Sequence, residues 1–124
     1  MKTEHKTSIL LAGNPNSGKT SIFNALTGAR QRVGNYPGVT VEKRQGQLRL
    51  NGQTYEITDL PGTYSLTSFS PEERIAQDAL LNANGGVVVT VVDSTTLKRS
   101  LVLLAQIMQT GANPVLPNRI CGSL

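Results

Sequence analysis

Gly13-Asn14-Pro15-Asn16-Ser17-Gly18-Lys19-Thr20 decides the fold of this chain, because it fits the pattern G-x-x-x-x-G-K-[ST] of a phosphate-binding P-loop. Glycines let the backbone curl so that successive N–H groups point at phosphate oxygens. The helix expected to begin near Gly18 adds the positive end of its dipole. Lys19 is placed to reach the outer phosphates, and the Thr20 hydroxyl is placed to hold Mg²⁺.

The residues on both sides of this motif support the interpretation. Residues 8–12 form a short apolar run typical of a buried strand, and residues 21–27 predict a helix that ends at Gly28. The alternative is a glycine turn that binds nothing. A P-loop is favoured because the motif lies between a strand and a helix, as phosphate binding requires.

The composition bounds the class of protein. The chain has 124 residues, no Trp and a formal net charge of +4, with its basic residues scattered, so nucleic-acid binding is not expected. The single Cys121 excludes an internal disulfide and fits a reducing compartment. Residues 1–7 form a polar leader, and no apolar run approaches the roughly 18 residues of a membrane span. We therefore expect the chain as given to be soluble and cytoplasmic.

Residues 29–40 are expected to form a long loop, since they contain two glycines and a proline. Loops of this length in compact domains are usually functional. In a P-loop protein a switch loop occupies this place, and Thr40 would offer its hydroxyl to Mg²⁺ and its N–H to the terminal phosphate. An ordinary surface loop is the alternative.

Asn51-Gly52 predicts a tight β-hairpin between strands at residues 41–50 and 53–59. A two-residue turn fixes the residues that face each other across the hairpin: Leu50 and Gln53, Leu48 and Tyr55, Gly46 and Ile57. The first of these strands is otherwise polar, as is expected of an edge strand.

Asp59-Leu60-Pro61-Gly62 follows at the carboxyl end of the second hairpin strand. Asp-x-x-Gly is a weak motif by itself. Here it lies where a P-loop protein needs an aspartate to hold the Mg²⁺ shell through water. Gly62 can bring its backbone N–H to the γ-phosphate, and residues 63–69 are expected to form a second mobile loop.

Two further helices and two further strands are predicted. Ser70, Pro71 and Glu73 form a capping box that starts a helix running to about Asn82. Residues 87–93 are a β-branched run typical of a central strand.

Ser94 or Thr95 is expected to cap the next helix, which ends at Gly111, and residues 113–116 begin one more strand. That helix has an apolar stripe expected to face the sheet: Leu97, Leu101, Leu104, Ala105 and Met108.

These elements predict an α/β P-loop NTPase fold, with a mostly parallel sheet, helices on both faces and one antiparallel hairpin at an edge. Numbered as they occur in the chain, the five predicted strands should lie in the spatial order 2-3-1-4-5. They occupy residues 8–12, 41–50, 53–59, 87–93 and 113–116.

Three blocks together resemble the N-terminal G domain of the ferrous iron transport protein B family, a family of translation-factor-related GTPases. They are the P-loop, residues 31–42 (QRVGNYPGVTVE) and residues 59–66 (DLPGTYSL). The second and third blocks are the specific ones, whereas many GTPases share the P-loop. The resemblance covers roughly residues 8–116.

The resemblance implies a regulatory domain that binds and hydrolyses GTP. In the full-length family protein this domain lies on the cytoplasmic side of the cell membrane, attached to a C-terminal membrane permease. A homo-oligomer is compatible with this interpretation. The implied catalytic residues are Lys19, Thr40 and Gly62. Thr63 replaces the water-positioning glutamine of Ras-like enzymes, so slow intrinsic hydrolysis is expected.

The resemblance also implies ligands for Mg²⁺ (Thr20, Thr40 and Asp59) and for K⁺ beside the phosphates (Asn16). The residues expected to bind GTP or GDP come from the P-loop, the two switches and one position near the C-terminus. They are Gly13, Asn14, Pro15, Asn16, Ser17, Gly18, Lys19, Thr20, Ser21, Gly38, Val39, Thr40, Asp59, Gly62 and Asn118.

The C-terminal end departs from the family pattern, which reads guanine with Asn/Thr-Lys-x-Asp. Residues 118–121 keep the spacing, but the thiol of Cys121 cannot accept two N–H bonds as a carboxylate does. We therefore expect residues 117–124 to be a non-native tail and residues 8–116 to be an incomplete G domain. In such a domain the surface around Ile9, Leu11 and Ile22 should be poorly covered.

Three functions stay open at this point. The first is a Mg²⁺-dependent GTP hydrolase that acts as a switch. The second is a non-catalytic fragment that binds phosphates without base specificity. The third is a soluble GTPase of the ribosome-assembly type, against which the block Tyr64-Ser65-Leu66 argues.

Replacing Lys19 tests the P-loop assignment. Lys19→Ala should abolish nucleotide binding, because Lys19 is the lysine placed to reach the phosphates. The measurement is a titration of wild type and variant with a fluorescent GDP analogue. Equal affinities would remove the assignment.

Overall fold

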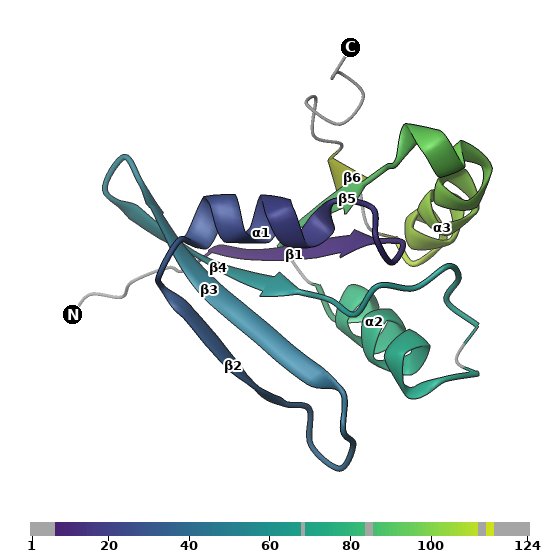
Figure 1. The fold of residues 1–124 in the computed structure, drawn as a ribbon, viewed down its shortest axis with the longest axis horizontal. Helices are drawn as coiled ribbons and strands as arrows, with labels where there is room; N and C mark the ends of the chain where they lie inside the picture. Colours follow the sequence, from purple (N-terminus) through teal and green to yellow (C-terminus); the bar gives the residue numbers. More distant parts are fainter. Residues whose placement is uncertain (1–6, 68, 84–85, 112–113, 116–124) are drawn as a thin grey trace.

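The computed structural model shows one sheet with helices on both faces (Figure 1). It describes residues 7–67, 69–83, 86–111 and 114–115. In chain order, the elements are β1 (Thr7–Gly13), α1 (Lys19–Thr27), β2 (Gln31–Asn35), β3 (Glu42–Leu50), β4 (Gln53–Asp59), α2 (Pro71–Leu81), β5 (Val87–Val91), a 3-10 turn (Ser94–Thr96), α3 (Leu97–Gln109) and β6 (Pro114–Val115).

The sheet has six strands in the order β2-β3-β4-β1-β5-β6. Strand β1 is parallel to β4 on one side and to β5 on the other, and β5 is parallel to β6. Strands β2, β3 and β4 pair antiparallel. The predicted spatial order is confirmed, and β5 is the central strand that its β-branched sequence predicts. The structure adds β2 at the hairpin edge.

Strand β2 corrects the expectation that residues 29–40 form a loop and that the strand following them is the edge. Gln31 to Asn35 pair antiparallel with the first half of β3, from Glu42 to Gly46. The Gln31 side chain donates to the Asn24 side chain (2.9 Å) and to the Gly28 carbonyl oxygen (3.1 Å), which turns the chain back along β3. Backbone pairing, rather than side-chain pattern, stabilises β2, and its exposed residues give no alternation from which a strand could be predicted.

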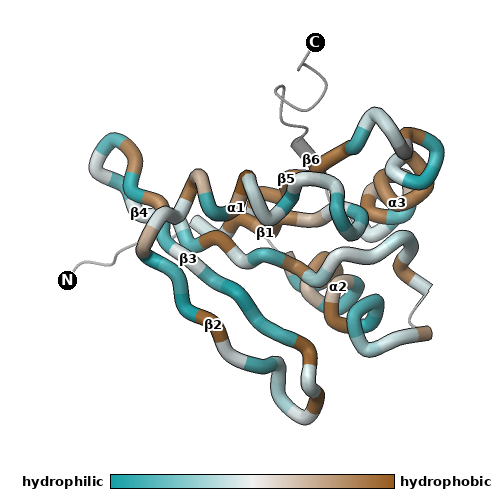
Figure 2. The backbone as a smooth tube through the Cα atoms, viewed as in Figure 1, coloured by the Kyte–Doolittle hydropathy of each residue, from teal (hydrophilic) through white to brown (hydrophobic). Residues whose placement is uncertain are grey.

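The predicted hairpin between β3 and β4 is confirmed residue by residue. Its register pairs Leu50 with Gln53 and Leu48 with Tyr55. Asn51 and Gly52 have φ angles of 53° and 80°, which is the left-handed conformation that this turn requires. The hairpin of β2 and β3 is mostly hydrophilic, in contrast to β5 (Figure 2).

Two apolar clusters hold the helices on the two faces of the sheet. On one face Phe23 of α1 packs with Leu11 and Ile57. On the other face Leu80 of α2 and Ile107 of α3 belong to one cluster. The expectation that Leu11 and Ile22 are poorly covered is wrong. Their exposed fractions are 0% and 8%, because α1 itself lies across these strands. Ile9 is partly buried beside them.

Helix α3 presents a different face to the sheet from the predicted one. Ser100, Leu103 and Ile107 are buried, whereas Leu101 and Met108 of the predicted stripe are about half exposed, at 48% and 57%. The helix carries apolar residues around most of its circumference, so periodicity alone does not define the inner face. A polar contact does, since the buried Ser100 hydroxyl accepts a hydrogen bond from the Asp93 N–H (3.2 Å).

One of the two predicted helix caps is confirmed, and the other is wrong. Ser70 caps α2 as predicted, with its hydroxyl accepting from the Glu73 N–H at 3.1 Å. Neither Ser94 nor Thr95 caps the next helical segment. Asp93 does so, because its carboxylate accepts from the Thr95 N–H (3.0 Å) and the Thr95 hydroxyl (2.8 Å). A carboxylate at the end of β5 reaches two donors at once, which neither hydroxyl can do.

Gly46 in β3 provides a test of the packing of α1 on the hairpin. A Cβ at this position would overlap the Thr27 side chain and lie 3.0 Å from the Arg30 carbonyl oxygen. Gly46→Ala should therefore lower the free energy of unfolding by about 1–3 kcal/mol, measured by urea denaturation. Gly34→Ala is the matched control, because a Cβ there meets nothing within 4 Å.

Thr27→Ser in the Gly46→Ala background should recover part of this loss, since it removes the overlapping methyl group and keeps the hydroxyl that donates to the Phe23 carbonyl oxygen. Equal stability of Gly46→Ala and wild type would contradict the observed packing.

Candidate phosphate-binding site

The carboxyl ends of three strands meet at one edge of the sheet and position the site. Along the parallel pairs, Gly13 of β1 lies beside Val91 of β5, and Leu11 lies beside Asp59 of β4. Residues 14–18 leave this edge as a loop, and α1 begins at Lys19. Ligands of open α/β sheets bind at such an edge, outside the strand ends.

The loop encloses a cavity of about 430 Å³ that is lined by residues 14–21 and by Gly62. Asn16 and Gly18 adopt left-handed conformations, with φ angles of 62° and 92°. Gly18 is the N-cap of α1, and no side chain caps this helix terminus. The N–H groups of the first turn are thus left for an anion, with the helix dipole in support.

Ser17 carries a second sign of a polar ligand. Its hydroxyl oxygen is buried and has no hydrogen-bond partner among the described residues. Gly13 keeps the space beside it open, because a Cβ on Gly13 would lie 3.1 Å from both the Ser17 hydroxyl and the Val91 carbonyl oxygen. A buried hydroxyl without a partner is costly, so the loop is built for a polar group that the protein itself does not supply.

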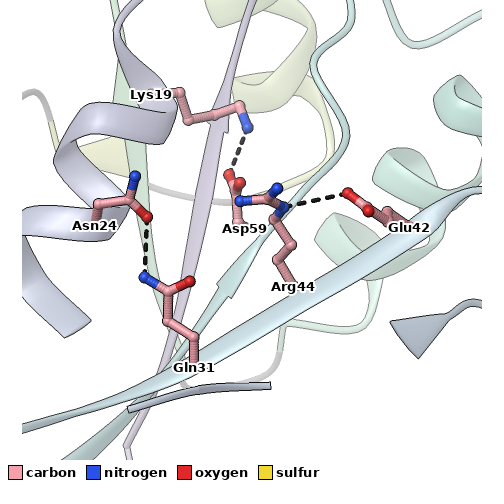
Figure 3. A network of polar contacts seen from close by, with 6 residues as sticks. All are labelled: Lys19, Asn24, Gln31, Glu42, Arg44 and Asp59. Atoms are coloured by element: carbon pink, nitrogen blue, oxygen red, sulfur yellow. Dashed lines mark hydrogen bonds and ion pairs between the residues drawn. The ribbon is translucent and has the colours of Figure 1, made fainter. Parts of the chain in front are cut away.

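Lys19 and Asp59 form an ion pair at the floor of the site (Figure 3). Lys19 projects from the first turn of α1, and Asp59 ends β4. Their side chains are only 8% and 6% exposed, so each neutralises a charge that burial alone would strongly disfavour. Asp59 is not among the residues that line the cavity, and Lys19 is. The lysine that the sequence predicts to meet phosphates is therefore paired with the aspartate that it predicts to serve Mg²⁺.

Gly62 joins the segment after β4 to the P-loop. A Cβ on Gly62 would lie 2.9 Å from the Pro15 Cα and 3.0 Å from the Pro15 nitrogen. Next to it, the Thr63 N–H donates to the Gly13 carbonyl oxygen at 3.1 Å. Only glycine allows the two backbones to come this close, which gives the weak Asp-x-x-Gly motif a steric reason.

Asn14 lines the cavity and also forms buried hydrogen bonds to other parts of the protein. Its side chain is buried, with the residue 1% exposed, and its amide nitrogen donates to the Thr63 carbonyl oxygen (2.8 Å) while its oxygen accepts from the Ser100 hydroxyl (3.2 Å). Ser100 on α3 was not predicted from the sequence, because nothing in a single serine of a helix indicates a distant partner.

Three residues of the segment 63–69, which the sequence predicts to be a mobile loop, are hydrogen-bonded to the start of α2. The Glu73 carboxylate accepts from the Ser65 hydroxyl (3.1 Å), the Thr67 hydroxyl (2.8 Å) and the Phe69 N–H (3.0 Å). The bond from Thr67 contributes most to lowering the pKa of Glu73 below its usual range. Because these donors favour the charged carboxylate, the bonds weaken as the pH falls through the folded-state pKa.

The predicted switch residues Gly38, Val39 and Thr40 lie at the tip of the β2–β3 hairpin and do not line the phosphate cavity. The tip is closed by two backbone bonds, from the Tyr36 N–H to Val41 (3.0 Å) and from the Val39 N–H to Tyr36 (3.3 Å). Thr40 is exposed. Asn118 and Cys121 lie outside the described residues.

The donor set fits Mg²⁺ better than a softer metal. Thr20 and Asp59 offer oxygen ligands, and the described part of the chain holds no cluster of three or more His, Cys, Asp or Glu side chains. Mg²⁺ is commonly held by one or two protein oxygens together with substrate phosphates and water, which is what this edge of the sheet can supply.

Fold and site together define a P-loop nucleoside-triphosphate-binding domain of the α/β class. The chain belongs to the ferrous iron transport protein B family, whose family model matches residues 7–120. The family predicted from the P-loop and the two switch blocks is thus confirmed.

Curated relatives give the same result. The Fe(2+) transporter FeoB of Methanocaldococcus jannaschii is 52% identical over 104 residues, which are 84% of this chain and 16% of that protein. The Fe(2+) transporter FeoB of Escherichia coli (strain K12) is 47% identical over 110 residues, which are 86% of this chain and 14% of that protein. The chain thus spans about one sixth of the length of these relatives.

Solved structures agree with the fold. The G domain of the T. maritima FeoB iron transporter superimposes with a TM-score of 0.85 at 48% identity, covering 90% of this chain and 70% of that one. The T. maritima cytosolic domain in its GDP form II also superimposes with a TM-score of 0.85 at 48% identity. The match covers 90% of this chain and 44% of that one. A GDP-bound mutant of S. thermophilus NFeoB superimposes with a TM-score of 0.82 at 50% identity. The match covers 89% of this chain and 42% of that one.

The ion pair between Lys19 and Asp59 generates a prediction about Mg²⁺. Without Mg²⁺, a diphosphate must break this pair to reach Lys19, so Asp59→Asn should tighten GDP binding in EDTA by about tenfold, equivalent to about 1.4 kcal/mol. With excess Mg²⁺ the gain should vanish, because the variant lacks the carboxylate of the metal shell. The measurement is a fluorescent-GDP titration with and without Mg²⁺.

Glu56→Gln is the matched control, since Glu56 is a carboxylate of the same strand that pairs with the exposed Arg32 at 3.5 Å. Unchanged GDP affinity of Asp59→Asn in EDTA would show that the pair does not compete with the nucleotide.

Proposed function

We propose that this chain binds GTP and GDP together with Mg²⁺ at the P-loop and serves as the GTP-hydrolysing regulatory domain of a ferrous iron transporter. The observation that carries the proposal is the cavity below the uncapped start of α1, with Lys19 and the partnerless Ser17 hydroxyl in its wall. The GDP-bound structures of similar FeoB domains support the choice of nucleotide.

In this proposal each part of the site has one task. The backbone N–H groups at the start of α1 hold the phosphates, and Lys19 leaves Asp59 to join them. The Thr20 hydroxyl and the freed Asp59 carboxylate would hold Mg²⁺, Asp59 through water. When bound, Mg²⁺ would supply positive charge to the phosphates.

Hydrolysis requires the two switches to reach the third phosphate. Gly62 already lies against the P-loop, so its N–H needs little movement. Thr40 must come from the hairpin tip. Thr63 is only 5% exposed, and its backbone is bonded to Gly13, so it offers no long side chain to position water. Slow intrinsic hydrolysis is the expected consequence.

The link to iron transport concerns the whole protein, of which this chain represents a small part. By family membership, we propose that the domain lies on the cytoplasmic side of the cell membrane and is followed by a permease that passes Fe²⁺. None of the helices in the described residues is long and apolar enough to cross a membrane. We propose that this domain regulates transport and that Fe²⁺ is the cargo of the permease.

A second candidate, phosphate binding without catalysis, is favoured by two observations. Thr40 lies outside the cavity and Lys19 is paired with Asp59, so neither side chain is in position to meet a third phosphate. The family match does not support the third function, a soluble GTPase of the ribosome-assembly type.

Competition between nucleotides tests the proposal. The fluorescent GDP analogue bound to the chain should be displaced by GDP and GTP, and phosphate release from GTP should be slow but dependent on Mg²⁺. Because Cys121 stands where the family has an aspartate, we expect ADP to compete within about tenfold of GDP. Displacement without any Mg²⁺-dependent phosphate release would favour the second candidate, and the absence of binding would overturn both.

The proposed K⁺ site generates a separate prediction. Asn16 is exposed at the rim of the cavity, where its side-chain oxygen could hold a monovalent cation beside the phosphates. Asn16→Ala should leave GDP affinity within about twofold and abolish any difference in GTP hydrolysis between K⁺ and Na⁺. Gln109→Ala, at an exposed amide side chain that does not line the cavity, is the control. A K⁺ advantage that survives Asn16→Ala would disprove this role.

A further inference from the structure

Tyr36 is distinct from its neighbours in the β2–β3 hairpin. Among residues 32 to 40 it alone is not exposed to solvent. The two backbone bonds that close the hairpin tip both involve Tyr36, one through its N–H and one through its carbonyl oxygen. Tyr36 is therefore the residue through which the tip is attached to the rest of the molecule.

The Tyr36 side chain lines a cavity of about 310 Å³ on the α2 face of the sheet. The walls come from four elements, with Leu10 on β1, Lys43 on β3, Leu60 just after β4 and Ala79 on α2. The Lys43 ammonium lies 5.5 Å from the centroid of the Tyr36 ring. These contacts hold the ring by apolar burial and by a cation–π interaction.

The hydroxyl group of Tyr36 is not satisfied in this position. It is buried and has no hydrogen-bond partner among the described residues. Burial, and then the negative charge of Asp59, raises the pKa of Tyr36. A buried hydroxyl without a partner opposes the burial of the ring, so the attachment is weak enough to be released.

The anchored tip leans on α2 and away from the P-loop. Tyr36, Pro37 and Val39 face Phe69 and Ile75 across a second cavity of about 610 Å³. Figure 1 shows the hairpin of β2 and β3 extending away from α1. Thr40 follows Tyr36 by only four residues within the closed tip, is exposed and does not line the phosphate cavity.

We propose that Tyr36 anchors the hairpin tip where Thr40 is kept from the P-loop, and thereby sets how strongly the site distinguishes a nucleoside triphosphate from a diphosphate. The inference rests on the proposed function. A triphosphate with Mg²⁺ that captures Thr40 must first withdraw the ring from its cavity. A diphosphate has no such requirement, because it offers Thr40 no third phosphate.

Two substitutions at this position have different expected results. Tyr36→Ala removes the anchor, so the affinity for a non-hydrolysable GTP analogue with Mg²⁺ should rise by about tenfold while GDP affinity stays within about twofold. Tyr36→Phe keeps the ring and removes the unsatisfied hydroxyl. Its preference for the triphosphate should equal that of wild type or fall below it. Tyr55→Ala, on the other hairpin, is the matched control and should change neither affinity.

A spectroscopic measurement follows the movement directly. The chain contains no Trp, so Tyr36→Trp creates a single probe. Its emission should shift to the red when the triphosphate analogue and Mg²⁺ are added, and should stay unchanged with GDP.

An unaltered or lowered triphosphate affinity in Tyr36→Ala, with GDP binding retained, would overturn this inference alone. Absence of GDP binding in wild type would remove the proposed function and this inference with it.

Discussion

The parallel pairing of β1 with β4 on one side and β5 on the other is the constraint on which the rest of this structure depends. It brings Gly13, Asp59 and Val91 to the same edge of the sheet, although they are far apart in the sequence. The P-loop leaves the sheet at this edge, and α1 returns over the strands. Phe23 of α1 and Leu11 of β1 are buried together between the helix and the sheet. The same packing therefore stabilises the domain and orients the start of α1 toward a ligand.

Close backbone contacts turn that edge into a defined site. Gly62 lies against Pro15 without space for a side chain, and Asn14 connects the P-loop to Thr63 and to Ser100 on α3. The loop is thus fixed from two directions, and a movement of the segment after β4 is transmitted to it directly. The Lys19–Asp59 pair balances the two buried charges of this arrangement.

The β2–β3 hairpin is attached far less firmly than the edge that carries the P-loop. Its strands are held by backbone pairing, and the aromatic ring at its tip carries a hydroxyl that has no hydrogen-bond partner in the part of the chain that the structure describes. A segment stabilised in this way can change position without disturbing the two apolar clusters of the domain. The rigid and the movable parts of the site thus differ for a physical reason, which is the amount of apolar surface that each buries.

Local patterns in the sequence determined the P-loop, the capping box at Ser70 and the Asn51-Gly52 turn with its register, because each depends on residues close together in the chain. The order of the five predicted strands followed instead from the alternation of strands and helices along the chain. Tertiary structure decided the rest. Strand β2 depends on the free side of β3, the inner face of α3 depends on the Ser100 contacts with Asn14 and Asp93, and Gly46 is required by Thr27 across the α1 packing. These are contacts between distant segments, and no local pattern of residues encodes them.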